Sequence, residues 1–314
     1  MACNGALKPG HMEKHILHLL NEDYYLRAHY GQLEIHKGES LIQKIPLEDI
    51  HSVVIANRKI TLTGALLSEM AENGIPVILC DQRFEPSSVT LPYYRPTNTE
   101  TVRAQVEASE SLQTGIWKEI VKHKIQNQGL CLKRLGASGQ KLEQLLGTLQ
   151  DKNAGIIEAR AARYYWPEYF KRVDKDTKKR EAGTRNGVNG KLDYGYAIVR
   201  SAVLRELAGH GLIAALGLGH KTREHHFALA DDLMEPHRPF VDVALWEFTR
   251  DGKTEHKDWI RKAAALLTRK VKMNGQQVDV AQAIQDSVRS LGRAFTEKKA
   301  ERLNFPKTND LALE

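Results

Sequence analysis

The stretch FEPSSVTLPYYRPTNT, residues 84–99, separates two different sequence patterns. Its prolines and its Ser, Thr and Asn residues interrupt both the period of a helix and the alternation of a strand. Before it, apolar residues come in short runs, and after it they recur at helical spacing. The sequence therefore predicts an α+β fold, in which a small N-terminal β-rich domain with one helix precedes a larger all-α domain. The predicted bounds are 12–95 for the β domain, 96–106 for a linker and 107–314 for the helical domain.

The N-terminal part has the pattern of a small antiparallel sheet. Short runs separated by Gly, Asn, Glu or Pro are expected as strands at residues 15–20, 23–27, 32–36, 41–45 and 52–55. One helix is expected over residues 63–73, because Leu66, Leu67 and Met70 lie at helical spacing and Gly74 is a typical C-terminal stop. We expect this helix to pack on the sheet, together with a further run at 75–80.

The C-terminal part has helical periodicity along most of its length. Its apolar series are Leu112, Ile116, Ile120 and Ile125; Leu192, Tyr196, Val199, Val203 and Leu207; and Ile284, Val288, Leu291 and Phe295. A non-helical insert is expected at residues 171–190, where basic residues are followed by Gly and Asn. We interpret it as a mobile basic loop. Lys178, Lys179 and Arg180 are its candidate DNA contacts, and a solvated loop without a ligand is an equally good interpretation.

Composition excludes several classes of protein. With 314 residues, 41% hydrophobic and 27% charged, the chain is neither disordered nor fibrous. No stretch approaches the roughly 20 apolar residues of a membrane-spanning helix. Residues 1–11 have the appearance of an expression remnant and lack the order of a secretory signal. The expected location is therefore the cytoplasm.

Cysteine count and charge narrow the possible ligands. Cys3, Cys80 and Cys131 are far apart in the sequence, which excludes a disulfide framework and a cysteine zinc site. The formal charge of +7 favours a polyanionic partner. Residues 217–222 do not form a phosphate loop, because His220 stands where the second glycine is required. His225 and His226 lack the spacing of a zinc helix.

An acidic segment is the strongest candidate site. Asp231 and Asp232 lie four and three residues before Glu235, so each pair shares one helical face, and carboxylates this close repel unless a cation neutralises them. Pro236 and Pro239 would break the helix there, where side chains can converge on a divalent ion. A solvated acidic turn capped by Arg238 is the alternative. Taken alone, Glu158 is interpreted as an ordinary solvated carboxylate on a helix.

Three ordered motifs resemble a known family. They are GIIEAR around Glu158, LDYGYAIVR at residues 192–200, and Gly219-His220 followed by LADDLMEPHRP at residues 229–239. Together they resemble the integrase of CRISPR spacer acquisition, the Cas1 family, in the form found in systems with a single large RNA-guided nuclease. His237 stands where an aromatic or apolar residue is usual in relatives, and Asp193 where many carry Asn.

The resemblance implies a reaction and a site. Family members join the 3′-hydroxyl ends of a short DNA fragment to the CRISPR array by metal-dependent transesterification, and the helical domain is their catalytic domain. Glu158, His220 and Glu235 match the family's catalytic and metal-binding residues, with Mg²⁺ or Mn²⁺ as the expected ion. Basic residues near the three motifs are expected to hold DNA phosphates; these are Arg160, Arg163, Arg223 and Arg238.

The resemblance also implies partners. The expected assembly is a homodimer, formed through the β domain and bridged by a small second adaptation subunit, Cas2. Two alternatives remain open at this point: a metal-dependent nuclease acting on branched DNA, and a DNA-binding scaffold without catalysis. They differ from an integrase in whether the three presumed ligands converge and in whether a DNA 3′-hydroxyl is joined.

Overall fold

The computed structural model describes residues 15–19, 22–55, 57–80, 86–90, 99–184, 186–219, 226–252 and 255–312. The chain divides into two compact units, residues 1–94 and 95–314. The segment predicted to be an expression remnant, residues 1–11, lies outside the described residues, as does most of the predicted break between the units.

In the part of the N-terminal unit that the structure describes, called the β unit below, the strands form two four-stranded sheets rather than one. The first sheet has the order β1 (His15–Leu19), β5 (Ile50–Ile55), β7 (Val77–Cys80) and β8 (Pro86–Thr90). The second has the order β4 (Ser40–Pro46), β3 (Gln32–Lys37), β2 (Tyr25–His29) and β6 (Thr61–Leu62), and the 3₁₀ turn η1 (Leu47–Asp49) follows β4.

The strand directions correct the prediction of a purely antiparallel sheet. β2, β3 and β4 are antiparallel neighbours, as expected, but β1, β5 and β7 run parallel and only β8 is antiparallel to them. The strands β1 and β5 are separated in sequence by the whole β2–β4 meander. The spacing of apolar residues predicts where strands lie, but it does not predict which distant strands pair. This topology therefore could not be predicted from the short apolar runs in the sequence.

The helix of the β unit matches its prediction. α1 (Gly64–Glu72) begins where the Thr63 hydroxyl accepts a hydrogen bond from the Leu66 backbone N–H at 3.2 Å, and it ends before Gly74, whose φ is +68°. Its buried residues Leu66 and Met70 join the core between the sheets and the helix. The spacing that predicted the helix is therefore the spacing of its buried face.

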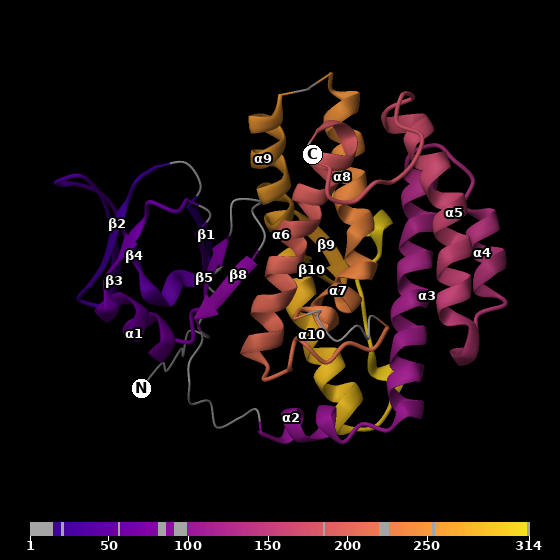
Figure 1. Ribbon diagram of the computed structural model, residues 1–314, viewed down its shortest axis with the longest axis horizontal. Helices are drawn as coiled ribbons and strands as arrows, with labels where there is room; N and C mark the ends of the chain where they lie inside the picture. Colours follow the sequence, from indigo (N-terminus) through magenta and orange to yellow (C-terminus); the bar gives the residue numbers. More distant parts are fainter. Residues whose placement is uncertain are drawn as a thin grey trace, which may run out of the picture. The chain divides into compact units, whose positions relative to one another are not determined.

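The C-terminal unit, called the helical unit below, is mostly helical, which confirms the predicted fold class (Figure 1). Its α-helices are α2 (Thr99–Val106), α3 (Glu110–Arg134), α4 (Gln140–Leu146), α5 (Ala154–Val173), α6 (Gly187–Gly209), α7 (Ala228–Met234), α8 (Arg238–Arg250), α9 (His256–Ala265) and α10 (Val280–Thr296). Its 3₁₀ turns are η3 (Asp151–Asn153), η4 (Glu235–His237), η5 (Leu266–Thr268), η6 (Ala300–Arg302) and η7 (Thr308–Asp310). Among the described residues, no helix is long and apolar enough to cross a membrane.

Three features of this unit differ from the sequence prediction. A two-stranded hairpin, β9 (Lys270–Met273) and β10 (Gln276–Asp279), interrupts the helices of a unit predicted to be all-α. Most of the predicted linker is the helix α2, whose Gln105 side chain is hydrogen-bonded to the Ile213 backbone N–H and C=O. The predicted insert is shorter than 171–190, because α5 extends to Val173 and α6 begins at Gly187.

Helix α3 forms the centre of the region that holds the candidate site. It packs against α4, α5 and η4, and Figure 1 shows α3, α4 and α5 side by side at one edge of the helical unit. Residues near the C-terminus also cover α3: the Arg134 guanidinium donates to the backbone oxygens of Leu311 at 2.7 Å and Thr308 at 3.4 Å. Segments far apart in sequence therefore meet on one long helix.

Candidate active site

Two of the predicted ligands meet at one lysine. The Lys124 ammonium on α3 lies 2.5 Å from Glu158 Oε1 on α5 and 2.6 Å from Glu235 Oε2 at the start of η4. Glu235 is 3% exposed, Lys124 12% and Glu158 20%, so the group is mostly removed from water but reachable at Glu158. Burial lowers the pKa of Lys124, but the charges of Glu235 and Glu158 outweigh it, and the pKa lies above its ordinary value.

The local sequence explains how each carboxylate reaches this point. On α5, Ile157 and Ala161 are buried, and Glu158 follows Ile157 at the boundary of that buried face. At Glu235 the chain changes from α7 to a 3₁₀ turn with Pro236 next in sequence, and α8 begins at Arg238. The expected helix break is therefore present, and it presents the Glu235 carboxylate to α3.

Asn127 fixes the turn that carries Glu235. It lies one turn after Lys124 on α3, and its amide nitrogen donates to the backbone oxygens of Pro236 at 2.8 Å and Pro306 at 3.0 Å. Its amide oxygen accepts from the Thr308 N–H at 3.1 Å. Because this buried amide bonds both to η4 and to the C-terminal segment, the turn that carries Glu235 is held by contacts between residues that are 109 and 181 positions apart in the sequence.

Arg238 borders the site, as the sequence suggested. Its guanidinium lies 3.1 Å from Glu235 Oε1, whereas the Lys124 ammonium lies 2.6 Å from Oε2. It also stacks over the Tyr196 ring, 4.9 Å from the centroid. Arg238 therefore neutralises Glu235 in part, and it connects the third sequence motif to the second.

The other acids of the third motif do not join Glu235. Asp232 is fully buried, and its Oδ2 accepts hydrogen bonds from the backbone N–H groups of Leu218 at 2.5 Å and Gly219 at 2.9 Å. Asp231 lies 3.5 Å from the Arg200 guanidinium. The acidic segment is thus not a solvated turn: its carboxylates are directed to three different partners.

The same hydrogen bonds position the chain just before His220. A Cβ atom at Gly219 would lie 2.5 Å from the Trp117 ring on α3, so a glycine is needed for this close approach. Gly219 is thereby held between Asp232 and α3. His220 and Arg223 themselves lie outside the described residues.

A buried network lies next to the site. The Asp242 carboxylate on α8 accepts hydrogen bonds from the hydroxyls of Tyr165 and Tyr196, both at 2.5 Å, and the Tyr169 hydroxyl donates to the Asp242 backbone oxygen at 3.0 Å. Burial raises the pKa of Asp242 to about 6, although the two tyrosine hydrogen bonds act in the opposite direction. Tyr196, which stacks on Arg238, is therefore held in place by a carboxyl group in the helical core.

The remaining predicted DNA contacts fall into two groups. Arg160 and Arg163 on α5 are exposed. In the loop, Lys178 and Lys179 are also exposed, with Lys179 paired to Glu181 at 2.8 Å. Arg180 is instead held by the Asp193 carboxylate and by Asn189 Oδ1 at 3.1 Å.

Asp193 thus has a structural partner in this chain. The Arg180 guanidinium that it binds also lies over the Tyr196 ring, 5.5 Å from the centroid. The acid at this position gives the loop a charged attachment to α6. The basic loop is therefore anchored at Arg180, and its exposed lysines lie before that anchor.

The donors fit a hard divalent cation. Two carboxylates that approach one cationic centre are the oxygen ligands that Mg²⁺ and Mn²⁺ take. Within the described residues no group of three His, Cys, Asp or Glu side chains is arranged so that it could hold a metal ion, and His220 is outside that range. The structure therefore brings together Glu158 and Glu235 of the predicted set.

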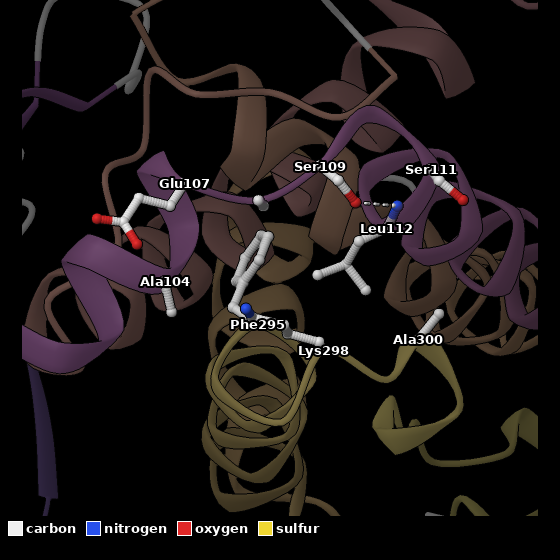
Figure 2. Close-up of a pocket in the computed structure, with 9 residues that line it drawn as sticks. Ala104, Glu107, Ser109, Ser111, Leu112, Phe295, Lys298 and Ala300 are labelled. Atoms are coloured by element: carbon white, nitrogen blue, oxygen red, sulfur yellow. Dashed lines mark hydrogen bonds between the residues drawn. The ribbon is translucent and has the colours of Figure 1, made fainter.

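A pocket of about 450 Å³ lies elsewhere in this unit (Figure 2). It is formed where α2 is followed by α3 and where α10 ends, and its lining includes Glu107, Ser109, Leu112, Phe295 and Lys298. Along α3, Ser111 of its lining is about 20 Å from Lys124 at 1.5 Å per residue. The pocket contains none of the predicted site residues, so it is separate from the candidate active site.

Comparison with known protein families identifies the family of this chain. The family described as CRISPR associated protein Cas1 matches residues 17–275. The chain belongs to the Cas1 family. A Cas1 relative from Neisseria meningitidis, named CRISPR-associated endonuclease Cas1, is 32% identical over 288 residues, covering 88% of this chain and 93% of the relative. Another Cas1 endonuclease, from Saccharolobus solfataricus, is 28% identical and covers 73% of each chain.

Solved structures show the same fold at low sequence identity. A casposase bound to its integration product has a TM-score of 0.78 at 22% identity, covering 95% of this chain and 94% of the casposase. The Cas1 protein of Thermotoga maritima has a TM-score of 0.75 at 15% identity, covering 90% of this chain and 97% of the other. These comparisons support the Cas1 fold over both units.

The residues of this Cas1 chain that sequence analysis missed are Lys124, Asn127 and Asp242. A signal for Lys124 was present: the apolar series Ile116, Ile120 continues at position 124, so the lysine interrupts a buried stripe. Asp242 likewise interrupts an apolar run on α8. A polar residue in a buried stripe needs a partner, but sequence alone does not say which one.

Proposed function

We propose that this chain is a divalent-metal-dependent integrase of CRISPR adaptation, which joins the 3′-hydroxyl ends of short DNA fragments to the CRISPR array by transesterification. Membership of the Cas1 family supports it, and the observation that carries it is the meeting of Glu158 and Glu235 at the Lys124 ammonium. A site in which helices from distant parts of the chain bring two carboxylates to one cation suits phosphodiester chemistry.

The residues have distinct roles in this proposal. Glu158, Glu235 and His220 would hold a Mg²⁺ or Mn²⁺ ion, and its charge would stabilise the reacting phosphate and lower the pKa of the attacking hydroxyl. Asn127 and Arg238 hold Glu235 in its orientation. Asp232 holds the backbone immediately before His220.

DNA is held by positive charge. Arg160 and Arg163 project from the same helix as Glu158 and are exposed, so they are suited to bind phosphates beside the site. Arg223, Arg238 and the loop residues Lys178, Lys179 and Arg180 complete the proposed DNA contacts. Arg180 would act mainly by holding the loop, because its guanidinium already binds Asp193.

The proposed assembly is a homodimer that binds the small subunit Cas2. A structural neighbour named as a Cas6-RT-Cas1–Cas2 complex has a TM-score of 0.75. The match covers 97% of this chain and 37% of that longer chain. The third motif further supports membership of systems with a single large RNA-guided nuclease. Light scattering at micromolar concentration tests the dimer: a species of 35.4 kDa alone would contradict it.

A strand-transfer assay tests the reaction. Full-length protein, with Cas2, is given a DNA fragment with free 3′-hydroxyls and a supercoiled array, in Mg²⁺, in Mn²⁺ and in EDTA. We expect joined product only with metal, and we expect Glu158→Gln, Glu235→Gln and His220→Ala each to reduce it by about 100-fold or more. Glu168→Gln is the matched control, because Glu168 is also on α5 but pairs with Lys171 at 2.5 Å.

The same assay separates the alternatives. Relatives are named endonucleases, which favours a nuclease as the second candidate. Such a nuclease would hydrolyse branched DNA, with water in place of the 3′-hydroxyl as nucleophile. Cleaved but unjoined DNA would support the nuclease. DNA binding with neither product, in both metals, would support the scaffold. Near wild-type joining by a Glu158→Gln or Glu235→Gln variant would contradict the proposed site.

A further inference from the structure

We propose that Lys124 is a positioning residue whose ammonium substitutes for the divalent cation in the metal-free protein and has to leave the two carboxylates before that cation binds. This inference rests on the metal site of the proposed function. It adds a competitor within the chain: binding of metal would be an exchange of one cation for another rather than the filling of a prepared space.

The contacts of Lys124 carry the inference. Its ammonium is 2.5 Å from an oxygen of Glu158 and 2.6 Å from an oxygen of Glu235, so one charge is shared between both presumed ligands. Arg238 approaches the other Glu235 oxygen at 3.1 Å. Lys124 is therefore the cation that bridges the two helical segments, whereas Arg238 neutralises Glu235 from one side.

Burial explains why a cation is needed there without metal. Glu235 is 3% exposed and Glu158 20%, and two ionised carboxylates this close to one point repel strongly where water is scarce. A single flexible lysine removes that repulsion and holds the carboxylates at a fixed separation. Arginine would be less suited, because its planar group is larger and less easily withdrawn.

The same geometry makes lysine and metal mutually exclusive. Carboxylate oxygens bind Mg²⁺ at about 2.0–2.1 Å, a shorter distance than either contact of the ammonium. Two cations between the same oxygens would repel each other at close range. The four-carbon stem of lysine allows the ammonium to move away while its backbone stays on α3.

Displacement of the Lys124 ammonium by a metal ion would change the net charge of the site to which DNA phosphates bind. In the metal-free group the two carboxylates balance the charges of Lys124 and Arg238. A bound divalent cation makes the group positive, and the released ammonium remains attached beside it. The site thus attracts a phosphate more strongly after metal binding than before.

Calorimetric titration of the full chain with Mn²⁺, without DNA, tests this exchange. We expect Lys124→Met to bind Mn²⁺ about tenfold more tightly than wild type, because the competing charge is gone. Lys122→Met is the matched control: it changes the net charge equally on the same helix, but Lys122 pairs with Glu119 at 2.8 Å, so its affinity should equal that of wild type.

The outcomes are distinguishable. Wild type that binds Mn²⁺ with the same or higher affinity than folded Lys124→Met overturns the inference and leaves the proposed function intact. Failure of both proteins to bind Mn²⁺ overturns the inference together with the metal site of the proposed function.

A measurement on wild type covers the case in which Lys124→Met does not fold. Amine-reactive labelling, read by mass spectrometry, should increase at Lys124 when Mg²⁺ is added, and labelling at Lys122 should be unchanged. Unchanged labelling of Lys124 with Mg²⁺ present would overturn the inference, because the ammonium would not have left the carboxylates.

Discussion

The two units of the molecule arrange buried charge in opposite ways. In the β unit one carboxylate, Glu34, is surrounded by Arg27 and Lys44 at 2.8 Å, His36 at 3.1 Å and His29 at 3.3 Å. In the helical unit one ammonium, Lys124, is shared by two carboxylates. The first group has one acid and several bases, whereas in the second one ammonium lies between two acids and Arg238 contacts one of them.

This difference separates a structural charge cluster from the proposed metal site. Hydrogen bonds from Lys44, Arg27 and His36 hold the pKa of Glu34 well below its usual range, and losing one base leaves the others in place. Losing Lys124 leaves two carboxylates facing each other. Two carboxylates bridged by one lysine are suited to the cation exchange proposed above, whereas the Glu34 carboxylate is contacted by four basic side chains.

The largest effect should come from removing the shared lysine. In EDTA, we expect Lys124→Met to lower the stability of the helical unit by about 3 kcal/mol, because it removes the cation shared by Glu158 and Glu235 and leaves Arg238 in contact with Glu235 alone. Lys44→Met should destabilise the β unit much less, since Arg27 and two histidines still contact Glu34. Hydrogen exchange read by mass spectrometry follows both units in each variant.

A double variant decides whether repulsion is the cause. Adding Glu235→Gln to Lys124→Met should recover part of the lost stability, since only one of the two carboxylates then keeps its charge. If the stability losses of the two substitutions were strictly additive, Lys124 would contribute packing alone, and the contrast with the Glu34 cluster would not hold.

An intermediate effect should appear in the pH dependence. The pKa of Asp242 is raised to about 6, so the folded protein holds this proton where the unfolded chain, with a pKa of about 3.9, has lost it. Its contribution to stability is full below about pH 3.9 and is lost as pH rises through 6. The pKa of Glu34 is lowered, so its contribution is full above the unfolded pKa of about 4.3 and is lost as the pH falls below that value.

Urea unfolding at pH 5 and pH 7 measures this contrast. The chain has four tryptophans, Trp117, Trp166, Trp246 and Trp259, all in the helical unit, so tryptophan fluorescence follows that unit. Wild type should lose more stability than Asp242→Asn between the two pH values, and Glu34→Gln should behave as wild type does. Equal losses in wild type and Asp242→Asn would contradict the raised pKa.

The smallest effect should come from the exposed basic loop. Replacing Lys178 and Lys179 by Ala should reduce DNA affinity modestly and flatten the plot of log affinity against log salt by about one unit for each lost phosphate contact. Arg180→Ala should instead lower the melting temperature, because Arg180 binds Asp193 and Asn189. An unchanged slope in a double variant of wild-type stability would place the DNA path at Arg160 and Arg163.

Much of the architecture was readable from periodicity. The helical series beginning at Leu112, Leu192 and Ile284 lie in α3, α6 and α10, and the Thr63 cap and Gly74 stop bound α1 as expected. These features depend on residues that lie within one or two helical turns of each other, so the sequence pattern alone predicts them. The order of parallel strands and the β9–β10 hairpin were not readable in this way.

In the candidate site, too, the sequence predicted local features but not the contacts between residues far apart in the chain. The motif around Glu235 predicted a helix break with a carboxylate at it, and the resemblance to the Cas1 family selected Glu158 and Glu235 from 39 acidic residues. Only the tertiary structure placed Lys124 between them and used Asn127 to tie η4 to residues 306 and 308. Such contacts join residues from 34 to 181 positions apart, and they form because long helices pack side by side. A sequence pattern records which side chains are polar or buried, whereas the partner of each buried charge is decided by packing.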